Sequence, residues 1–550
     1  MRRRHLAIAA AALTAIVFAR APHPQTAAAA PKLAVIIVVD QMRADYVDRF
    51  HGEWTGGLKR LVDEGAWFSH AAYPYLTTVT CVGHATISTG TFPHVHGIMQ
   101  NAWWDREAGR TTTCTFDPTA SVVSYGTTQK TSDSPHFLEV PTFTDVMRAD
   151  RNAHVATVSL KARSAIMLAG HGADAATWLS DSLDGWMTSS AYTTAPVAAV
   201  RDFVSHHSID ADVGKTWTRL LPAADYREPD DGVGEAPPTG WTRTFPHVLG
   251  SAGLPPDATY RAQWERSPFG DAYVERFAAA LVDGLKLGRH GTTDVLGVSF
   301  SSPDLVGHAF GPDSQEIHDM YAHLDRTIGA LLDHLDTSVG RGNYVVALSA
   351  DHGVTSIPEQ LEARGADAGR LTLSSIEHVV DAAAVAAAGE GRYVQNVGGN
   401  DIYLAAGMYE KLAAKTGALD AVLEALRRSP GIQAAFTKDQ LRHGAASTDR
   451  LLRAAALSYV EGRSGDLVIA PKRGWMFFAT GATHGTASED DQHVPILLFG
   501  AGIKHGVFTA PATPADIAPT LASLCGVTLP KAEGHALRDA LTTAVGSAPH

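Results

Sequence analysis

A run of apolar, β-branched residues from Leu33 to Val39 constrains the fold of this 550-residue chain more than any other feature. Such a run, with no polar side chain in it, is typical of a strand that is buried on both faces of a sheet. The segments from His154 to Ser159, Asp294 to Phe300 and Tyr344 to Ser349 also predict strands. Helix-like segments lie between them, so the sequence favours an α/β fold with a mainly parallel sheet.

Acidic residues and histidines follow several of the predicted strands at the point where each strand ends. In open α/β sheets, ligands bind beyond the carboxyl ends of the strands, so we expect these side chains to share one site. Pro303 can begin a helical turn that puts Asp304 and His308 on one helix face. A loop of small residues surrounds His484 and would let that histidine approach an ion. The candidate ligands are Asp40, Asp304, His308, Asp351, His352 and His484.

Thr80 opens a helix-compatible run that stops at Gly90. A hydroxyl at a helix start lies among unpaired backbone N–H groups, a position that favours negative charge. Threonine is a weak nucleophile, so its hydroxyl would need a base or a metal ion. The alternative is that Thr80 only caps the helix. Cys81 is disfavoured as a nucleophile because no base or basic cluster flanks it.

Three carboxylates and three imidazoles suit zinc, which accepts both ligand types. Six ligands are more than one tetrahedral ion needs, so the sequence predicts two zinc ions, an arrangement suited to phosphoryl transfer. We leave three further histidines out of the metal site: His84, His94 and His96. We expect His493 to support the ligands without binding an ion itself.

Lys161 and Arg163 follow the predicted strand that ends at Ser159. If the strand continues, both side chains face one side and present two cations to phosphate oxygens. The alternative is a solvated Lys-Ala-Arg loop.

Composition and charge limit the domain organisation and the partners. Residues 1–30 combine a basic start with an apolar core of signal-peptide length, and the alternative is an uncleaved N-terminal anchor. No later stretch reaches transmembrane length. We expect a catalytic domain over 31–365 with a surface insertion at about 202–263, an inserted cap at 366–470 and a final catalytic part at 471–545. The net charge is −13 and no basic run follows the N-terminus, so nucleic acid is not expected as a partner. The three cysteines allow at most one disulfide, and the sequence does not choose the pair.

Several motifs together resemble the alkaline phosphatase superfamily: TVTCVGHATISTG, HGIMQN, SLKARSAIMLAG, DLVGH, ADHG and THGT, with Asp40. The likeness is greatest to its exported threonine-nucleophile branch of PafA-type enzymes, which is related to the nucleotide pyrophosphatase/phosphodiesterases. Val82 departs from the proline of the usual T-x-P-G-H form. The sulfatase context C/S-x-P/A-x-R is not present at Cys81.

The resemblance implies a mainly parallel central sheet sandwiched by helices, with an inserted cap. It implies that Thr80 is the nucleophile and that Asn101, Lys161 and Arg163 bind the nonbridging phosphoryl oxygens. One zinc ion would be held by Asp304, His308 and His484. The other would be held by Asp40, Asp351, His352 and Thr80.

We therefore expect an exported, periplasmic or secreted, monomeric phosphomonoesterase that acts on small phosphate esters through a phosphothreonine. One alternative is a phosphodiesterase or nucleotide pyrophosphatase with the same metal site. A more distant alternative is a noncatalytic zinc-binding protein, which would leave Thr80, Lys161 and Arg163 without a role.

Overall fold

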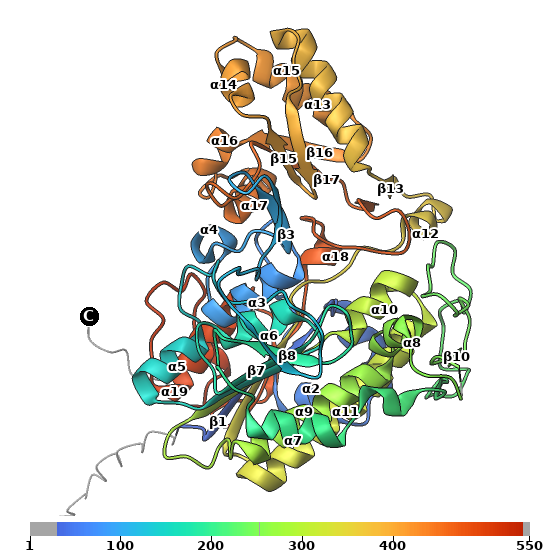
Figure 1. Cartoon of the computed structure of the whole chain (residues 1–550), viewed down its shortest axis with the longest axis vertical. Coiled ribbons are helices and arrows are strands. Elements are labelled where there is room, and N and C mark those ends of the chain that lie inside the picture. Colours follow the sequence, from blue (N-terminus) through green and yellow to red (C-terminus); the bar gives the residue numbers. More distant parts are fainter. Residues whose placement is uncertain (1–29, 252, 543–550) are drawn as a thin grey trace, which may run out of the picture.

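The structure, a computed structural model, describes residues 30–251 and 253–542 (Figure 1). The signal peptide predicted within 1–30 therefore lies outside the described residues, except for Ala30. No helix in the described part of the chain is both long and apolar enough to cross a membrane.

A ten-stranded sheet forms the centre of the larger body, and its five middle strands are parallel. The outer strands join mainly antiparallel: β19 (Ile496–Gly500) pairs with β12 (Tyr344–Ser349) and β2 (Ala66–Phe68), and β8 (Trp186–Ser189) pairs with β7 (Ala175–Leu179) and β5 (Val122–Tyr125). The predicted α/β fold with a mainly parallel central sheet is confirmed. In spatial order the strands are β20 (Gly506–Phe508), β2 (Ala66–Phe68), β19 (Ile496–Gly500), β12 (Tyr344–Ser349), β1 (Leu33–Val39), β11 (Asp294–Phe300), β6 (Val155–Ser159), β7 (Ala175–Leu179), β8 (Trp186–Ser189) and β5 (Val122–Tyr125).

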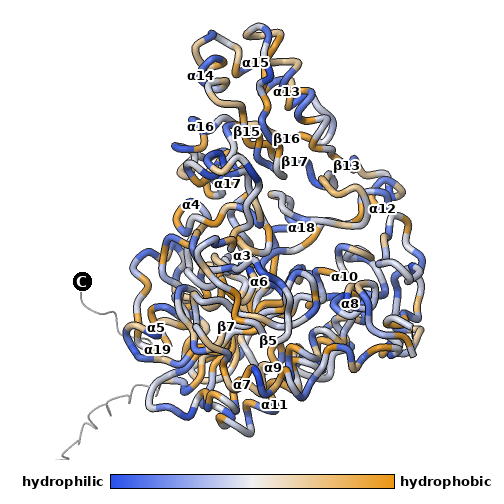
Figure 2. The backbone as a smooth tube through the Cα atoms, viewed as in Figure 1, coloured by the Kyte–Doolittle hydropathy of each residue, from blue (hydrophilic) through white to orange (hydrophobic). Residues whose placement is uncertain are grey.

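The central strands are buried along their whole length. Every residue of β1, β11 and β12 is buried, as expected for strands covered on both faces. The hydropathy colouring shows the apolar residues gathered around this sheet and polar ones toward the outside (Figure 2).

Helices cover both faces of the sheet (Figure 1). One layer contains α2 (Gly57–Glu64), α9 (Pro268–Gly284) and α11 (Gln315–Leu335). The other contains α3 (Thr80–Thr89), α5 (Phe143–Arg151), α6 (Ala162–Ala169) and α19 (Ile517–Cys525). The helix α11 turns Leu324, Ile328 and Leu331 into the core, which explains its 3–4 residue apolar spacing.

The segment at about 202–263 forms short elements on the side of α11. These are the end of α7 (Ala198–His206), a two-stranded pair of β9 (Thr216–Trp217) and β10 (His247–Val248), and the start of α8 (Ala258–Glu265). The buried Trp217 indole donates a 2.6 Å hydrogen bond to Asp319 of α11 and attaches this segment to the core.

A second, four-stranded sheet lies in the upper part of the molecule in Figure 1. Its order is β14 (Val394–Gly398), β15 (Asp401–Leu404), β17 (Leu467–Pro471) and β16 (Ile432–Thr437). The helices α13 (Leu373–Ala388) and α15 (Ala418–Arg428) share a hydrophobic cluster with this sheet that is separate from the main core. Its chain also touches the larger body, because Ser458 accepts 3.0 Å hydrogen bonds from the N–H groups of Leu76 and Thr77.

Candidate active site

The register of the parallel strands brings the predicted site residues to one edge of the sheet. Val39 of β1 is level with Phe300 of β11, and Val38 is level with Ser349 of β12. Asp40 and Asp351 therefore lie close to the first residues of the helix α10 (Ser302–Phe310).

Thr80 is the first residue of α3, and the helix stops at its C-cap residue Gly90, as the sequence predicted. Gly90 has a left-handed φ of 71°. Val79, not Thr80, occupies the N-cap position, so the alternative that Thr80 only caps the helix is wrong. The buried Thr80 hydroxyl lies 3.4 Å from Nε2 of His352. Gly83 permits this approach, because a Cβ there would lie 2.0 Å from the backbone oxygen of Asp351.

Two groups of possible ligand atoms include His352, the imidazole next to the Thr80 hydroxyl. One consists of Asp40, Asp351 and His352, and the other of Asp304, His352 and His484. Within each group the atoms lie within 4.8 Å of one another. The imidazoles of His352 and His484 stack with ring centroids 3.5 Å apart. His352 thus belongs to both groups in this arrangement.

His308 lies beside the second group. Its Nε2 is 3.2 Å from Oδ1 of Asp304, one helical turn away on α10. The predicted helical turn after Pro303 is present, since α10 covers both residues.

Backbone carbonyls orient the three imidazoles. The Nδ1 atoms of His308, His352 and His484 lie 2.8–3.0 Å from the oxygens of Ala482, Gly353 and Thr78. Each Nδ1 can thus donate its proton to a carbonyl, which leaves Nε2 as a neutral acceptor directed at the site.

The carboxylates fit divalent cations. Among the described residues, Oδ1 of Asp40 and Oδ2 of Asp351 are buried and have no hydrogen-bond partner, which is costly unless another group binds them. Burial, together with the neighbouring carboxylates, raises the pKa of Asp40, and burial raises that of Asp351. Burial opposes ionisation of Asp304, but His308, when it is protonated, and Lys161 outweigh burial and lower the pKa of that carboxyl. Cations bound here would relieve the mutual repulsion of the three carboxylates.

Lys161 and Arg163 do not continue strand β6, so the predicted geometry is wrong. The strand ends at Ser159, Lys161 is the N-cap of α6, and Arg163 lies in the first turn of that helix. The helix start nevertheless keeps both cations at the site. Nζ of Lys161 is 2.6 Å from Oδ2 of Asp40 and also bonds to Asp304. With Asn101, both residues line a cavity of about 250 Å³.

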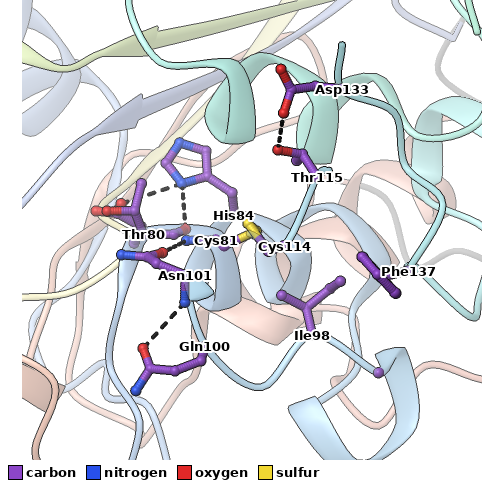
Figure 3. Close-up of a disulfide and its surroundings, with 12 residues drawn as sticks. Thr80, Cys81, His84, Ile98, Gln100, Asn101, Cys114, Thr115, Asp133 and Phe137 are labelled. Atoms are coloured by element: carbon purple, nitrogen blue, oxygen red, sulfur yellow. Dashed lines mark hydrogen bonds and ion pairs between the residues drawn. A yellow bond between two sulfur atoms is a disulfide. The ribbon is translucent and has the colours of Figure 1, made fainter. Parts of the chain in front are cut away.

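Asn101 is held against the start of α3. Its Oδ1 accepts a 2.8 Å hydrogen bond from the N–H of Cys81, the residue after Thr80 (Figure 3). Cys81 forms a disulfide with Cys114, a pairing that the sequence left open, while Cys525 is free and buried.

Gln41 is a site residue that the sequence analysis missed. It follows Asp40 with φ 69°, and its N–H donates to Oδ1 of Asp351 at 3.1 Å. Glycine and asparagine are the residues that usually indicate a left-handed backbone conformation. A glutamine at this position gives no such signal, so the sequence could not predict the turn.

The histidines that we did not assign to the ions lie outside both ligand groups. His84 is buried behind Thr80, with Nδ1 2.8 Å from the backbone carbonyl oxygen of Thr80 and Nε2 2.9 Å from Oγ of Ser299. His94 pairs with Glu533, and buried His96 lies 3.2 Å from the Thr86 hydroxyl. His493 is exposed and lines a different cavity, so our expectation that it supports the ligands is wrong.

Comparison with known proteins identifies the family. Residues 34–493 match the family described as Type I phosphodiesterase / nucleotide pyrophosphatase. The chain belongs to this family. The chain is 33% identical over 520 residues to alkaline phosphatase PafA of Elizabethkingia meningoseptica, covering 91% of this chain and 92% of that protein. It is 32% identical over 518 residues to alkaline phosphatase PhoV of Synechococcus elongatus, covering 92% of each chain.

The crystal structure of wild-type PafA has the same fold. It superposes with a TM-score of 0.84 at 31% sequence identity and covers 94% of this chain and 100% of that one. The family resemblance predicted from the motifs is confirmed, and this member of the family is an enzyme of the alkaline phosphatase class.

Proposed function

We propose that the chain is an exported, zinc-dependent alkaline phosphatase that hydrolyses phosphate monoesters through a phosphothreonine at Thr80. The observation that carries this proposal is the position of the Thr80 hydroxyl. It lies at a helix start, 3.4 Å from His352, an imidazole common to both groups of ligand atoms. A metal ion bound by these ligand atoms could activate a hydroxyl at this position, so no neighbouring base would be needed.

Two zinc ions would account for the composition of the site. The unpartnered oxygens of Asp40 and Asp351 and the directed Nε2 atoms supply ligands of the kinds that zinc accepts. We assign one ion to Asp40, Asp351 and His352, with Thr80 beside them. We assign the other to Asp304, His308 and His484. Such a pair supplies Lewis acidity, which favours loss of a hydroxyl proton and stabilises charge on a leaving oxygen.

The residues of the chain then carry the two displacements. The Thr80 oxygen attacks phosphorus as the bond to the ester oxygen breaks, and the alcohol leaves. A water molecule next attacks the phosphothreonine, which releases inorganic phosphate and restores the Thr80 hydroxyl. In both steps Asn101, Lys161 and Arg163 would bind the nonbridging oxygens, together with N–H groups at the start of α3.

The paired cations favour a monoester as the substrate. A monoester dianion carries one more negative charge on its nonbridging oxygens than a diester does. Lys161 is buried between carboxylates, and the pKa of its ammonium is raised because Asp304 and Asp40 outweigh the effect of burial. The two carboxylates therefore favour the charged form of this ammonium. Arg163 adds a second fixed cation at the same cavity.

A phosphodiesterase is the second candidate, because the description of the matching family includes that activity. The ligand groups and Thr80 suit both reactions. The two cations distinguish them, since a diester carries an organic group in place of one charged oxygen.

Export is supported by two features. Residues 1–30 have the sequence of a signal peptide, and the Cys81–Cys114 disulfide suits an oxidising compartment. We propose a periplasmic or secreted monomer that acts on small phosphate esters.

The proposal is tested by comparing p-nitrophenyl phosphate with bis-p-nitrophenyl phosphate, before and after chelation. We expect faster hydrolysis of the monoester, loss of both activities with chelator, and recovery with zinc. Faster hydrolysis of the diester would favour the second candidate. Zinc binding without hydrolysis of either ester would contradict both.

A further inference from the structure

The Cys81–Cys114 disulfide joins two segments that carry parts of the proposed active site. Cys81 lies next to Thr80 in the first turn of α3, and Cys114 directly follows β4 (Arg110–Thr113). Among the strands that the structure describes, β4 pairs only with β3 (Ala102–Asp105), which begins directly after Asn101. The disulfide therefore ties the nucleophile helix to the hairpin that presents Asn101 (Figure 3).

Both half-cystines also hydrogen-bond to Asn101. The N–H of Cys81 donates to its side-chain Oδ1 at 2.8 Å, and the N–H of Cys114 donates to its backbone oxygen at 2.9 Å. Both oxygens of Asn101 are thus fixed by the two residues that the disulfide connects. Within the described chain, Nδ2 of Asn101 has no hydrogen-bond partner, so this donor is available at the cavity lined by Lys161 and Arg163.

The disulfide attaches the end of the hairpin next to Asn101, whereas Arg106 at the turn attaches the other end by hydrogen bonds to Ser464 and Asp466. A two-stranded ribbon is marginally stable in isolation, and β3 and β4 form a sheet of their own. At the helix, Val79 makes no side-chain cap, and the Asn101 side chain accepts from one of the unpaired N–H groups instead. A single hydrogen bond of this kind is weak, so the covalent link keeps the two partners in register.

We infer that the Cys81–Cys114 disulfide is a positioning element that holds the Asn101 amide in place to bind a phosphoryl oxygen beside Thr80. This inference rests on the proposed function, because it assigns Asn101 to phosphate. It names Cys81 and Cys114 as positioning residues, since neither sulfur needs to touch the substrate.

A double-mutant cycle separates positioning from general stability. Inorganic phosphate binding to zinc-loaded protein is measured by calorimetry in four chains: wild type, Cys81→Ala with Cys114→Ala, Asn101→Ala, and the triple variant. We expect removal of the disulfide to weaken phosphate binding about tenfold, as for one lost charged hydrogen bond. In the Asn101→Ala background, removal of the disulfide should cause no further loss. Cys525→Ala, which removes a buried sulfur elsewhere, is the matched control and should leave binding unchanged.

Two results would overturn the inference: unchanged phosphate affinity without the disulfide, or the same loss in the presence and absence of the Asn101 side chain. If the double variant does not fold, Cys114→Ser leaves helix α3 intact and permits the same comparison. Phosphate binding needs no turnover, so the cycle can succeed even if monoester hydrolysis fails. Failure of the inference and failure of the proposed function are therefore separate outcomes.

Discussion

The side chain of Gln41 donates a hydrogen bond from Nε2 to Oδ1 of Asp304 at 2.6 Å. The same residue donates its backbone N–H to Asp351. Gln41 thus connects carboxylates from the two proposed ion sites. Gly307 of α10 makes room for it, since a Cβ there would lie 1.8 Å from Oε1 of Gln41.

We expect Gln41→Ala to weaken zinc binding by roughly ten- to a hundredfold, the range found when residues that orient metal ligands are removed. Competition with a coloured chelator measures this affinity directly. Gln41→Gly is the matched variant, because glycine suits the φ of 69° and removes the same side chain. Both variants should lose affinity equally. Wild-type affinity in both would show that Asp304 does not need this hydrogen bond.

Lys161 and Arg163 should separate monoester from diester hydrolysis. We predict that replacing both by alanine lowers monoester kcat/KM by roughly a hundredfold or more, since each charged hydrogen bond is worth about 1.5–3 kcal/mol. Diester hydrolysis should fall much less. Arg148→Ala, which removes a surface ion pair with Asp174, is a suitable control. Equal loss of both activities would mean that the pair is structural and gives no monoester preference.

Elemental analysis of active protein should find about two zinc ions per chain, as in other paired-metal hydrolases. Asp40 belongs to only one of the two ligand groups, so Asp40→Asn should reduce the zinc content to about one ion per chain. Chelators should abolish activity, and added zinc should restore it. A fully active protein with one ion per chain would contradict the paired site.

Glu316 of α11 should make stability depend on pH. Burial, with Glu235 nearby, raises the pKa of this carboxyl from 4.5 to about 9, and His247 lies 2.9 Å away. Between pH 4.5 and about pH 9, the Glu316 carboxyl keeps its proton in the folded state and loses it in the unfolded state. The free energy of unfolding should therefore fall as pH rises. One such group changes the unfolding free energy by at most about 1.4 kcal/mol per pH unit. Thermal melts should show a shallower decline for Glu316→Gln, and parallel curves for both proteins would contradict this assignment.

The sequence predicted the elements whose signal is local. The apolar run from Leu33 to Val39 is strand β1 with the same bounds, and β11 and β12 likewise begin and end as expected. The prediction that Asp304 and His308 lie on one helix face is confirmed, because α10 begins at Ser302, directly before Pro303. Because parallel strands end at one edge, these local signals predicted that Asp40, Asp304 and Asp351 lie together, whereas His484 reaches them from a loop.

Other features depend on long-range packing and were not predictable in this way. Lys161 and Arg163 were expected on a continued strand, but the chain turns into helix α6 after Leu160. The residue types allow either conformation, and packing decides. The Cys81–Cys114 pair depends on where the hairpin carrying Asn101 folds back, which no local pattern records. His493 was expected near the ligands from its position before β19, yet its side chain faces outward.

Acid quenching during turnover of a monoester tests whether Thr80 is the nucleophile. Mass spectrometry of the quenched wild-type enzyme should locate phosphate on Thr80. Thr80→Ala should keep its zinc but lose roughly a thousandfold or more in rate, whereas Thr80→Ser should keep substantial activity because a hydroxyl remains. Phosphate found on Thr80 in the wild type and none in Thr80→Ala is the result that we predict. Turnover by Thr80→Ala near the wild-type rate, with no phosphate trapped at Thr80 in the wild type, would show that Thr80 is not the nucleophile.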